Sequence, residues 1–412
     1  MYNYLDHFNL LNNSQFGFRK NISTSHAIIN TLQYIYDNLD EGNTVISFFL
    51  DFSKAFDCVD HSILLDKMGV YGVRGIARNW FQSYLTGRQQ YVSLNGENSE
   101  LCLIDRGVPQ GSILGPLLFL IFINDFPNCS NFFKFTLFAD DSTLSCKFNN
   151  ISYNQIINTL TLELVNINNW ISSNCIKINT NKSNFIIFSH RKKVEIEQIP
   201  FHDSFIHSTN STKFLGIIID KNLIFRDHIN YISSKISKSI GILYRLNYFL
   251  PPEILKLLHN SLVLPYLSYG VVSWYGAPRY VSNRVQVLQK KAIRAIHMLP
   301  FNSHTNDLFK INKFLKLDDI YKSNLCSHLF YYQNINNNNN ITARFLSLSD
   351  IHEHNTRHRH SILIPQYHRS KSQASFIFQS IKTWNDLPED IKNTDTIRNL
   401  KLKLRSHHCD LY

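Results

Sequence analysis

Residues 132–146 predict a β-hairpin that carries two adjacent carboxylates, and this feature limits the fold most strongly. An aromatic, β-branched run ends at Phe138, and a second strand-like run follows from Ser142. Two such runs separated by turn-forming residues are typical of a hairpin. The turn then holds Asp140 and Asp141, which repel each other unless a cation lies between them. Turn chemistry alone is the competing interpretation, since Asp is common in tight turns; however, a turn selected for stability favours Asp-Gly.

A third carboxylate, Asp51, follows the near-continuous apolar run Thr44–Leu50, which predicts a strand buried on both faces. If this strand neighbours the hairpin, Asp51 converges with Asp140 and Asp141 at one edge of a sheet. Three such carboxylates can hold two Mg²⁺ ions for in-line displacement at phosphorus. Mg²⁺ prefers oxygen ligands and keeps several waters, so substrate phosphates would complete its coordination.

The charge of the chain indicates a polyanionic partner. Its net charge is +11 over 412 residues, and residues 226–300 hold ten Lys or Arg against two acids, which gives +8 in that segment. A solvated helical face is one interpretation. Phosphate contacts that release counterions explain the scarcity of acids better, so nucleic acid is expected ahead of a membrane surface.

Other sequence features indicate an intracellular protein of the nucleus and cytoplasm. The seven cysteines include no CxxC pair, and this indicates neither a zinc ribbon nor a disulfide framework. Residues 1–13 have neither the basic nor the apolar region of a signal peptide. The longest apolar stretch, 113–123, is shorter than a membrane span and predicts a buried helix. The sequence leaves the oligomeric state open.

Local patterns place these features on secondary structure. We expect helices at 24–41, from about Lys54, at 76–85 and at 153–173, and mostly helices after Phe225. A second hairpin is expected around Asn95-Gly96, and further strands at 185–188 and 214–219. Gly107–Gly111 predicts a loop that opens the apolar helix.

At this point the order of motifs resembles a reverse transcriptase, in the style of the non-LTR, jockey-like retrotransposons. The motifs are QFGFRKNISTSHA (15–27), FLDFSKAFD (49–57), RGVPQGSILGPLLF (106–119), FADD (138–141), NTNK (179–182) and FLG (214–216). The match runs in order from about residue 15 to 300. The resemblance implies an RNA-directed DNA polymerase, with dNTPs as substrates and an RNA template and DNA primer as partners.

For the reacting groups, the resemblance implies that Asp51 and Asp140 are the principal ligands of two Mg²⁺ ions, for which Mn²⁺ can substitute. Asp141 completes the set and is usually less indispensable. Lys182 matches a lysine that protonates departing pyrophosphate; by its local pattern alone it is a solvated lysine before a strand.

For the nucleotide pocket, the resemblance implies that Phe56 is an aromatic steric gate against a ribose 2′-OH. A core Phe on the first turn of a helix is its other interpretation. Gln110 and Gly111 match a loop that lines the nucleotide and template pocket; a glycine-rich helix entry is the alternative. Phe214–Gly216 resembles the primer grip, and otherwise it is a buried strand.

The implied fold is α+β, a right-hand polymerase. We expect partial fingers at 1–43, the palm at 44–225, a helical thumb and connection at 226–335, an Asn-rich linker at 336–341, and a basic, His-rich C-terminal segment at 342–412. The motif HEHNTRHRH (352–360) could recruit zinc, but its arginines and the missing cysteine framework favour a basic segment, so no metal is assigned there.

The chain begins just before QFGF, whereas the resemblance implies further finger segments upstream, so the sequence predicts an N-terminally truncated reverse transcriptase. An upstream endonuclease domain, common in this family, is not recognised in this chain. Two alternatives stay open. One is a nucleic-acid-binding remnant with little catalysis; the other is an RNA-copying RNA polymerase, which Phe56 disfavours.

Overall fold

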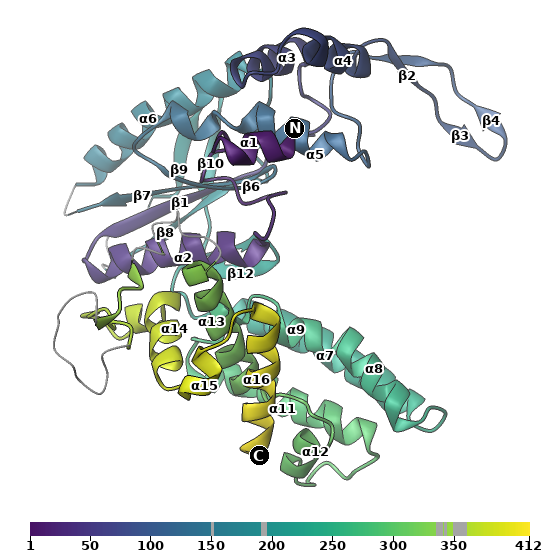
Figure 1. Ribbon diagram of the computed structural model, residues 1–412. Helices are drawn as coiled ribbons and strands as arrows, with labels where there is room; N and C mark the ends of the chain where they lie inside the picture. The colour runs from purple at the N-terminus through teal and green to yellow at the C-terminus, as the bar shows by residue number, and fades with distance from the viewer. Residues whose placement is uncertain (150–151, 191–195, 335–340, 342–343, 349–360) are drawn as a thin grey trace. The chain divides into compact units, whose positions relative to one another are not determined.

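The computed structural model describes residues 1–149, 152–190, 196–334, 341, 344–348 and 361–412 (Figure 1). The chain forms two compact units. Unit 1 comprises Met1–Ala27 and Gly42–Leu215, and unit 2 comprises Ile28–Glu41 and Gly216–Tyr412. The Asn-rich tract at 336–340 and the His-rich motif at 352–360 lie outside the described residues. Within the ranges described, no helix is both long and apolar enough to cross a membrane.

Unit 1 is built on a mixed sheet with the strand order β6-β7-β1-β8-β10-β9. The central strand β1 (Thr44–Leu50) is buried along its whole length, as expected from its apolar run. It pairs antiparallel with β7 (Asp141–Phe148) on one side and with β8 (Asn184–Phe188) on the other. β6 (Lys134–Phe138) forms the predicted hairpin with β7, and β9 (Gln198–Phe201) and β10 (Ser204–Ser208) complete the sheet.

Helices pack on this sheet through their apolar residues. α6 (Tyr153–Ser173) has the predicted bounds, and it buries Ile156, Leu160, Leu164, Ile167 and Ile171, one helical face. α5 (Leu114–Ile123) is the predicted apolar helix and is buried almost throughout. The other helices of the unit are α1 (Tyr2–His7), α3 (His61–Val70), α4 (Gly75–Leu85) and the 3-10 helix η1 (Phe126–Cys129).

A β-ribbon extends from α4 in Figure 1. β2 (Arg88–Gln90) pairs with β5 (Cys102–Ile104), and β3 (Ser93–Leu94) pairs with β4 (Glu97–Asn98). The turn between β3 and β4 is Asn95-Gly96, where both residues have positive φ (52° and 90°). This confirms the predicted second hairpin, because Asn-Gly tolerates the left-handed conformation that such a turn needs.

Two local predictions were wrong. A helix was expected from about Lys54, but α3 begins at His61, because Lys54 has a φ of 47° and Asp60 caps the helix by accepting the N–H groups of Ser62 and Ile63. The strand expected at 214–219 is divided between β11 (Ser211–Phe214) and β12 (Ile217–Asp220). It breaks where Leu215 and Gly216 take positive φ (44° and 84°).

Unit 2 is mostly helical, as expected. Among its described residues after β12, the helices are α7 (Arg226–Leu246), α8 (Pro252–Leu262), α9 (Leu264–Ser268), α10 (Val271–Trp274), α11 (Arg279–Ile296), α12 (Asn306–Ile311), α13 (Leu317–Asn334), η4 (Ser372–Ala374), α14 (Phe376–Asn385), α15 (Glu389–Lys392) and α16 (Ile397–Asp410). α7 packs against α11, and α13 packs against α14 and α16.

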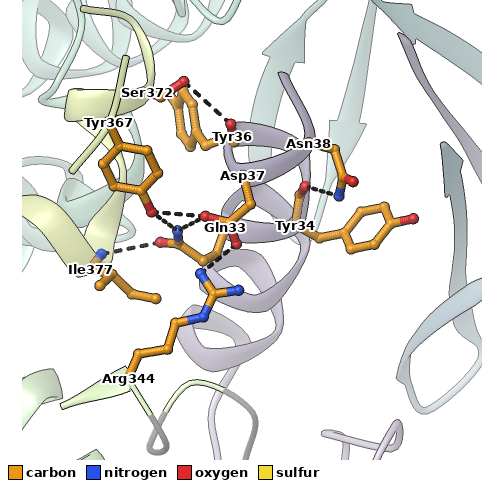
Figure 2. A network of polar contacts seen from close by, with 9 residues as sticks. All are labelled: Gln33, Tyr34, Tyr36, Asp37, Asn38, Arg344, Tyr367, Ser372 and Ile377. Atoms are coloured by element: carbon orange, nitrogen blue, oxygen red, sulfur yellow. Dashed lines mark hydrogen bonds and ion pairs between the residues drawn. The ribbon is translucent and has the colours of Figure 1, made fainter. Parts of the chain in front are cut away.

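The helix α2 (Thr24–Asp40) lies early in the sequence, yet from Ile28 onward it belongs to unit 2. Figure 2 shows the polar contacts that hold it there. Gln33 donates to the Tyr367 hydroxyl at 2.9 Å and accepts the N–H of Ile377 at 3.1 Å. Asp37 forms an ion pair with Arg344 at 2.7 Å and accepts the Tyr367 hydroxyl at 2.8 Å. The C-terminal part of the chain therefore binds an N-terminal helix, a packing that the sequence did not indicate.

Candidate active site

The carboxylates that the sequence predicts to be catalytic lie at the ends of neighbouring strands. β1 and β7 are antiparallel, with Leu50 opposite Ser142, so Asp51 leaves β1 beside the point where Asp141 begins β7. Asp140 occupies the turn between β6 and β7, in which Phe138 pairs with Asp141. The turn residues are thus Ala139 and Asp140, one position earlier than the Asp140–Asp141 turn expected, because Asp141 already pairs with β6.

Electrostatics within the site are unfavourable for the charged forms of Asp140 and Asp141. Burial raises the pKa of Asp141 to about 6, with further contributions from the negative charges of Asp140 and Asp51. Burial also raises the pKa of Asp140; Asp51 adds to this shift, and a backbone hydrogen bond opposes it. The three carboxylates are therefore close enough to repel one another.

The oxygen donors suit a hard divalent cation, because carboxylates are the protein ligands that Mg²⁺ prefers. A cation would also relieve the repulsion between the three aspartates. In the portion of the chain that the structure describes, however, no three His, Cys, Asp or Glu side chains are arranged to enclose a metal ion. The donor chemistry fits Mg²⁺, and the metal-ligand roles of Asp51, Asp140 and Asp141 stay a prediction.

Lys182 lies beside Asp51. Its Nζ atom is 4.0 Å from Asp51 Oδ2, and its side chain is 72% exposed. The main chain explains this placement, because the Asn179 N–H donates to the Asp51 carbonyl at 2.8 Å and the Asp51 N–H donates to Ser183 Oγ at 3.0 Å. The NTNK segment is thus joined directly to the end of β1, and Ser183 is a contact that sequence reasoning missed.

Phe56 lies half-buried in the turn that replaces the expected helix. Its ring stacks on Phe119 of α5, with centroids 4.3 Å apart, and it meets Phe18 edge-on at 6.4 Å. Its packing therefore comes from α5 and from the QFGF segment. The role of Phe56 as a steric gate stays a prediction.

The loop that carries Gln110 and Gly111 is tied to the same turn. The Val108 N–H donates to the Phe56 carbonyl at 2.8 Å, and Gln110 Nε2 donates to Asp57 Oδ1 at 2.8 Å. Gly111 has a φ of 75°, and beyond its two chain neighbours no residue places an atom within 4 Å of the position of a Cβ, so it faces open space. Across the described residues, no hydrogen bond or ion pair joins Gln110 or Gly111 to the three aspartates.

Phe214 of the FLG motif is buried, and its ring contacts Phe49 of β1 at 5.6 Å between centroids. This contact agrees with the buried-strand interpretation, and the primer-grip role is not tested by it.

The antiparallel strands β6, β7 and β1 thus bring together carboxylates at a hairpin turn and at the end of the adjacent strand, as the sequence predicted. Residues 1–219 match the family model for reverse transcriptase (RNA-dependent DNA polymerase). That match covers more than half of the 412 residues, so the chain belongs to the reverse transcriptase family.

The relatives that it resembles come from mobile elements. It is 29% identical over 308 residues to the RNA-directed DNA polymerase from mobile element jockey of Drosophila funebris, covering 71% of this chain and 33% of the relative. The probable RNA-directed DNA polymerase from transposon BS of Drosophila melanogaster is 27% identical over 310 residues, covering 71% and 33%. The predicted resemblance to non-LTR retrotransposon polymerases is confirmed. The chain spans about a third of the length of these relatives.

Among solved structures, apo telomerase from Candida tropicalis aligns with a TM-score of 0.41 and 10% identity, over 77% of this chain and 53% of telomerase. Similarity at this level does not by itself define a shared fold. The mixed helices and sheet described above confirm the predicted α+β class.

Proposed function

We propose that this chain copies RNA into DNA by adding dNTPs to a primer 3′-OH. The observation that supports this most directly is the convergence of Asp51 with Asp140 in the hairpin turn and Asp141 at the start of β7, in a chain of the reverse transcriptase family. Asp51, Asp140 and Asp141 would hold two Mg²⁺ ions, with Mn²⁺ as a substitute. When bound, these ions supply Lewis-acid stabilisation of the attacking and leaving oxygens.

Lys182, Phe56, Gln110 and Gly111 act directly on the substrates in this proposal. Lys182 donates a proton to the departing pyrophosphate, and its exposed side chain beside Asp51 leaves the ammonium free to reach it. Phe56 excludes a ribose 2′-OH, and Gln110 and Gly111 line the nucleotide and template pocket. Residues 1–43 serve as fingers and 44–225 as the palm. Residues 226–335 form the thumb on the template–primer backbone.

The test is primer extension by the purified chain. With an RNA template, an annealed DNA primer, dNTPs and Mg²⁺, we expect the primer to lengthen, and chelation of Mg²⁺ to stop extension because the carboxylates then lack their cation. Gel separation of labelled primers measures the product. Binding of the duplex without extension, at any Mg²⁺ or Mn²⁺ concentration, would replace this proposal with the alternative of a binding remnant.

Duplex binding should depend steeply on salt. Each phosphate neutralised contributes a log–log slope of about −0.9, and the ten Lys and Arg of residues 226–300 lead us to expect a slope steeper than about −3. Lys290→Glu with Lys291→Glu, both exposed on α11, should flatten that slope by about 2 and weaken binding, as fluorescence anisotropy would measure.

The matched control carries the same change in charge elsewhere in unit 2. Arg398→Glu with Lys401→Glu alters two exposed residues of α16, outside the 226–300 segment. Its slope should stay near that of the unmodified chain. Equal losses in the two double variants would show that net charge, and not a thumb surface, governs binding.

A further inference from the structure

The QFGF segment lies alongside the strand that leads to the catalytic turn. The Phe16 N–H donates to the Leu137 carbonyl at 2.7 Å, and the Leu137 N–H donates to the Ser14 carbonyl at 2.8 Å. Gln15 thereby forms a parallel bridge with Leu137, two residues before Ala139. This short pairing covers the end of β6 just before the hairpin turn.

The side chain of Gln15 reaches into the turn itself. Gln15 is 1% exposed, and its Oε1 atom accepts two backbone N–H groups, from Gly17 at 2.7 Å and from Ala139 at 3.1 Å. Its Nε2 atom is buried and has no hydrogen-bond partner in the described residues. A buried N–H donor without a hydrogen-bond partner lowers the free energy of unfolding. The two hydrogen bonds that Gln15 Oε1 accepts offset this cost.

The turn needs such support because of Ala139. Its φ is 55°, a left-handed conformation that is strained for a residue with a Cβ. The N–H that Gln15 accepts is the one on Ala139, directly before Asp140. The QFGF segment can approach the turn closely because residue 17 is a glycine. A Cβ at Gly17 would lie 2.3 Å from the Ala139 nitrogen and 3.0 Å from the Phe138 carbonyl carbon.

We propose that Gln15 is a positioning residue, which holds the strained Ala139–Asp140 turn so that the carboxylates of Asp140 and Asp141 face a shared divalent cation. Gln15 is not itself a ligand and touches no substrate in this proposal. The inference rests on the proposed function for its catalytic meaning. Its effect on metal binding, however, can be measured without catalysis.

The test compares two buried glutamines. Gln15→Met keeps the length of the side chain and removes the acceptor oxygen. Gln33→Met is the matched control, because Gln33 is also buried (3% exposed) and also loses its hydrogen bonds, but in unit 2. The measurements are the kcat and KM for dNTP in primer extension, the Kd for Mn²⁺ by calorimetry without substrates, and the melting temperature.

We expect Gln15→Met to lower kcat by about 100-fold with little change in KM for dNTP, since misplacement of a reacting group by about 1 Å can cost that much. Its Mn²⁺ affinity should fall by about tenfold, as for other groups that orient metal ligands. Gln33→Met should lower the melting temperature similarly and leave kcat and Mn²⁺ affinity unchanged. Equal kcat and Mn²⁺ values in the two variants would overturn the proposal.

Primer extension and Mn²⁺ binding distinguish failure of the proposed function from failure of the inference about Gln15. If the unmodified chain binds Mn²⁺ but extends no primer, the proposed function fails, and the Mn²⁺ affinities of the two variants still decide the role of Gln15. If the unmodified chain binds no Mn²⁺, the turn is not a metal site and the inference falls.

A second variant tests the same proposal in case the first variant does not fold. If Gln15→Met does not fold, the same change is made together with Ala139→Gly, because glycine takes the positive φ without strain. Ala139→Gly alone supplies the reference values. The double variant should again show weaker Mn²⁺ binding and lower kcat than this reference, and values equal to the reference would contradict the proposal.

Discussion

Asp140→Asn should lower Mg²⁺-dependent dNTP incorporation by at least about a thousandfold, because a neutral amide cannot replace the charge that holds the cation. A bound metal contributes several kcal/mol to transition-state stabilisation, and each 1.36 kcal/mol is a factor of ten in rate. Asp140 is the residue to change first, since it lies in the turn and interacts electrostatically with Asp51. Single-turnover primer extension at saturating dNTP measures the loss.

A matched control separates charge in the site from charge in general. Asp203→Asn makes the same chemical change at a carboxylate with a 91% exposed side chain, in the turn between β9 and β10 of the same unit. It should extend primers at the unmodified rate. Both variants should melt near the temperature of the unmodified chain. Activity of Asp140→Asn equal to that of Asp203→Asn would mean that the adjacent aspartates serve the turn alone.

Phe56→Ala should raise the efficiency of rNTP incorporation relative to dNTP by about tenfold or more, because removal of the ring opens the space that a 2′-OH would occupy. A difference of this size is typical of a pocket that discriminates by the bulk of one small group. The ratio of kcat/KM values for rNTP and dNTP with the same base measures it. Phe56→Tyr keeps the ring and should keep the original ratio.

The stacking on Phe119 makes a stability control necessary. Loss of the Phe56 ring also removes contacts at 4.3 Å between centroids, so Phe56→Ala should melt at a lower temperature. The sugar ratio is independent of the fraction of folded protein, because both substrates are measured on the same sample. An unchanged ratio with lowered stability would assign Phe56 to the core.

Much of the local structure could be predicted because short segments carry their own pattern. The bounds of α6, the buried strand β1 and the Asn95-Gly96 hairpin follow from periodicity and from turn residues within a single window of sequence. The start of α3 could not be predicted from the apolar pattern near Lys54. Its position depends on the cap at Asp60 and on a left-handed residue that the pattern does not reveal.

The sequence by itself predicted which carboxylates form the candidate site, since Asp51 follows a buried strand and Asp140 and Asp141 follow an aromatic one. Only the tertiary structure decided how these residues are held. Gln15 reaches Ala139 across 124 positions of sequence, and Asp51 meets Ser183 across 132. Likewise, α2 packs with residues more than 300 positions later. Such contacts depend on strand register and on the packing of distant side chains, and these are properties of the whole fold that no local pattern encodes.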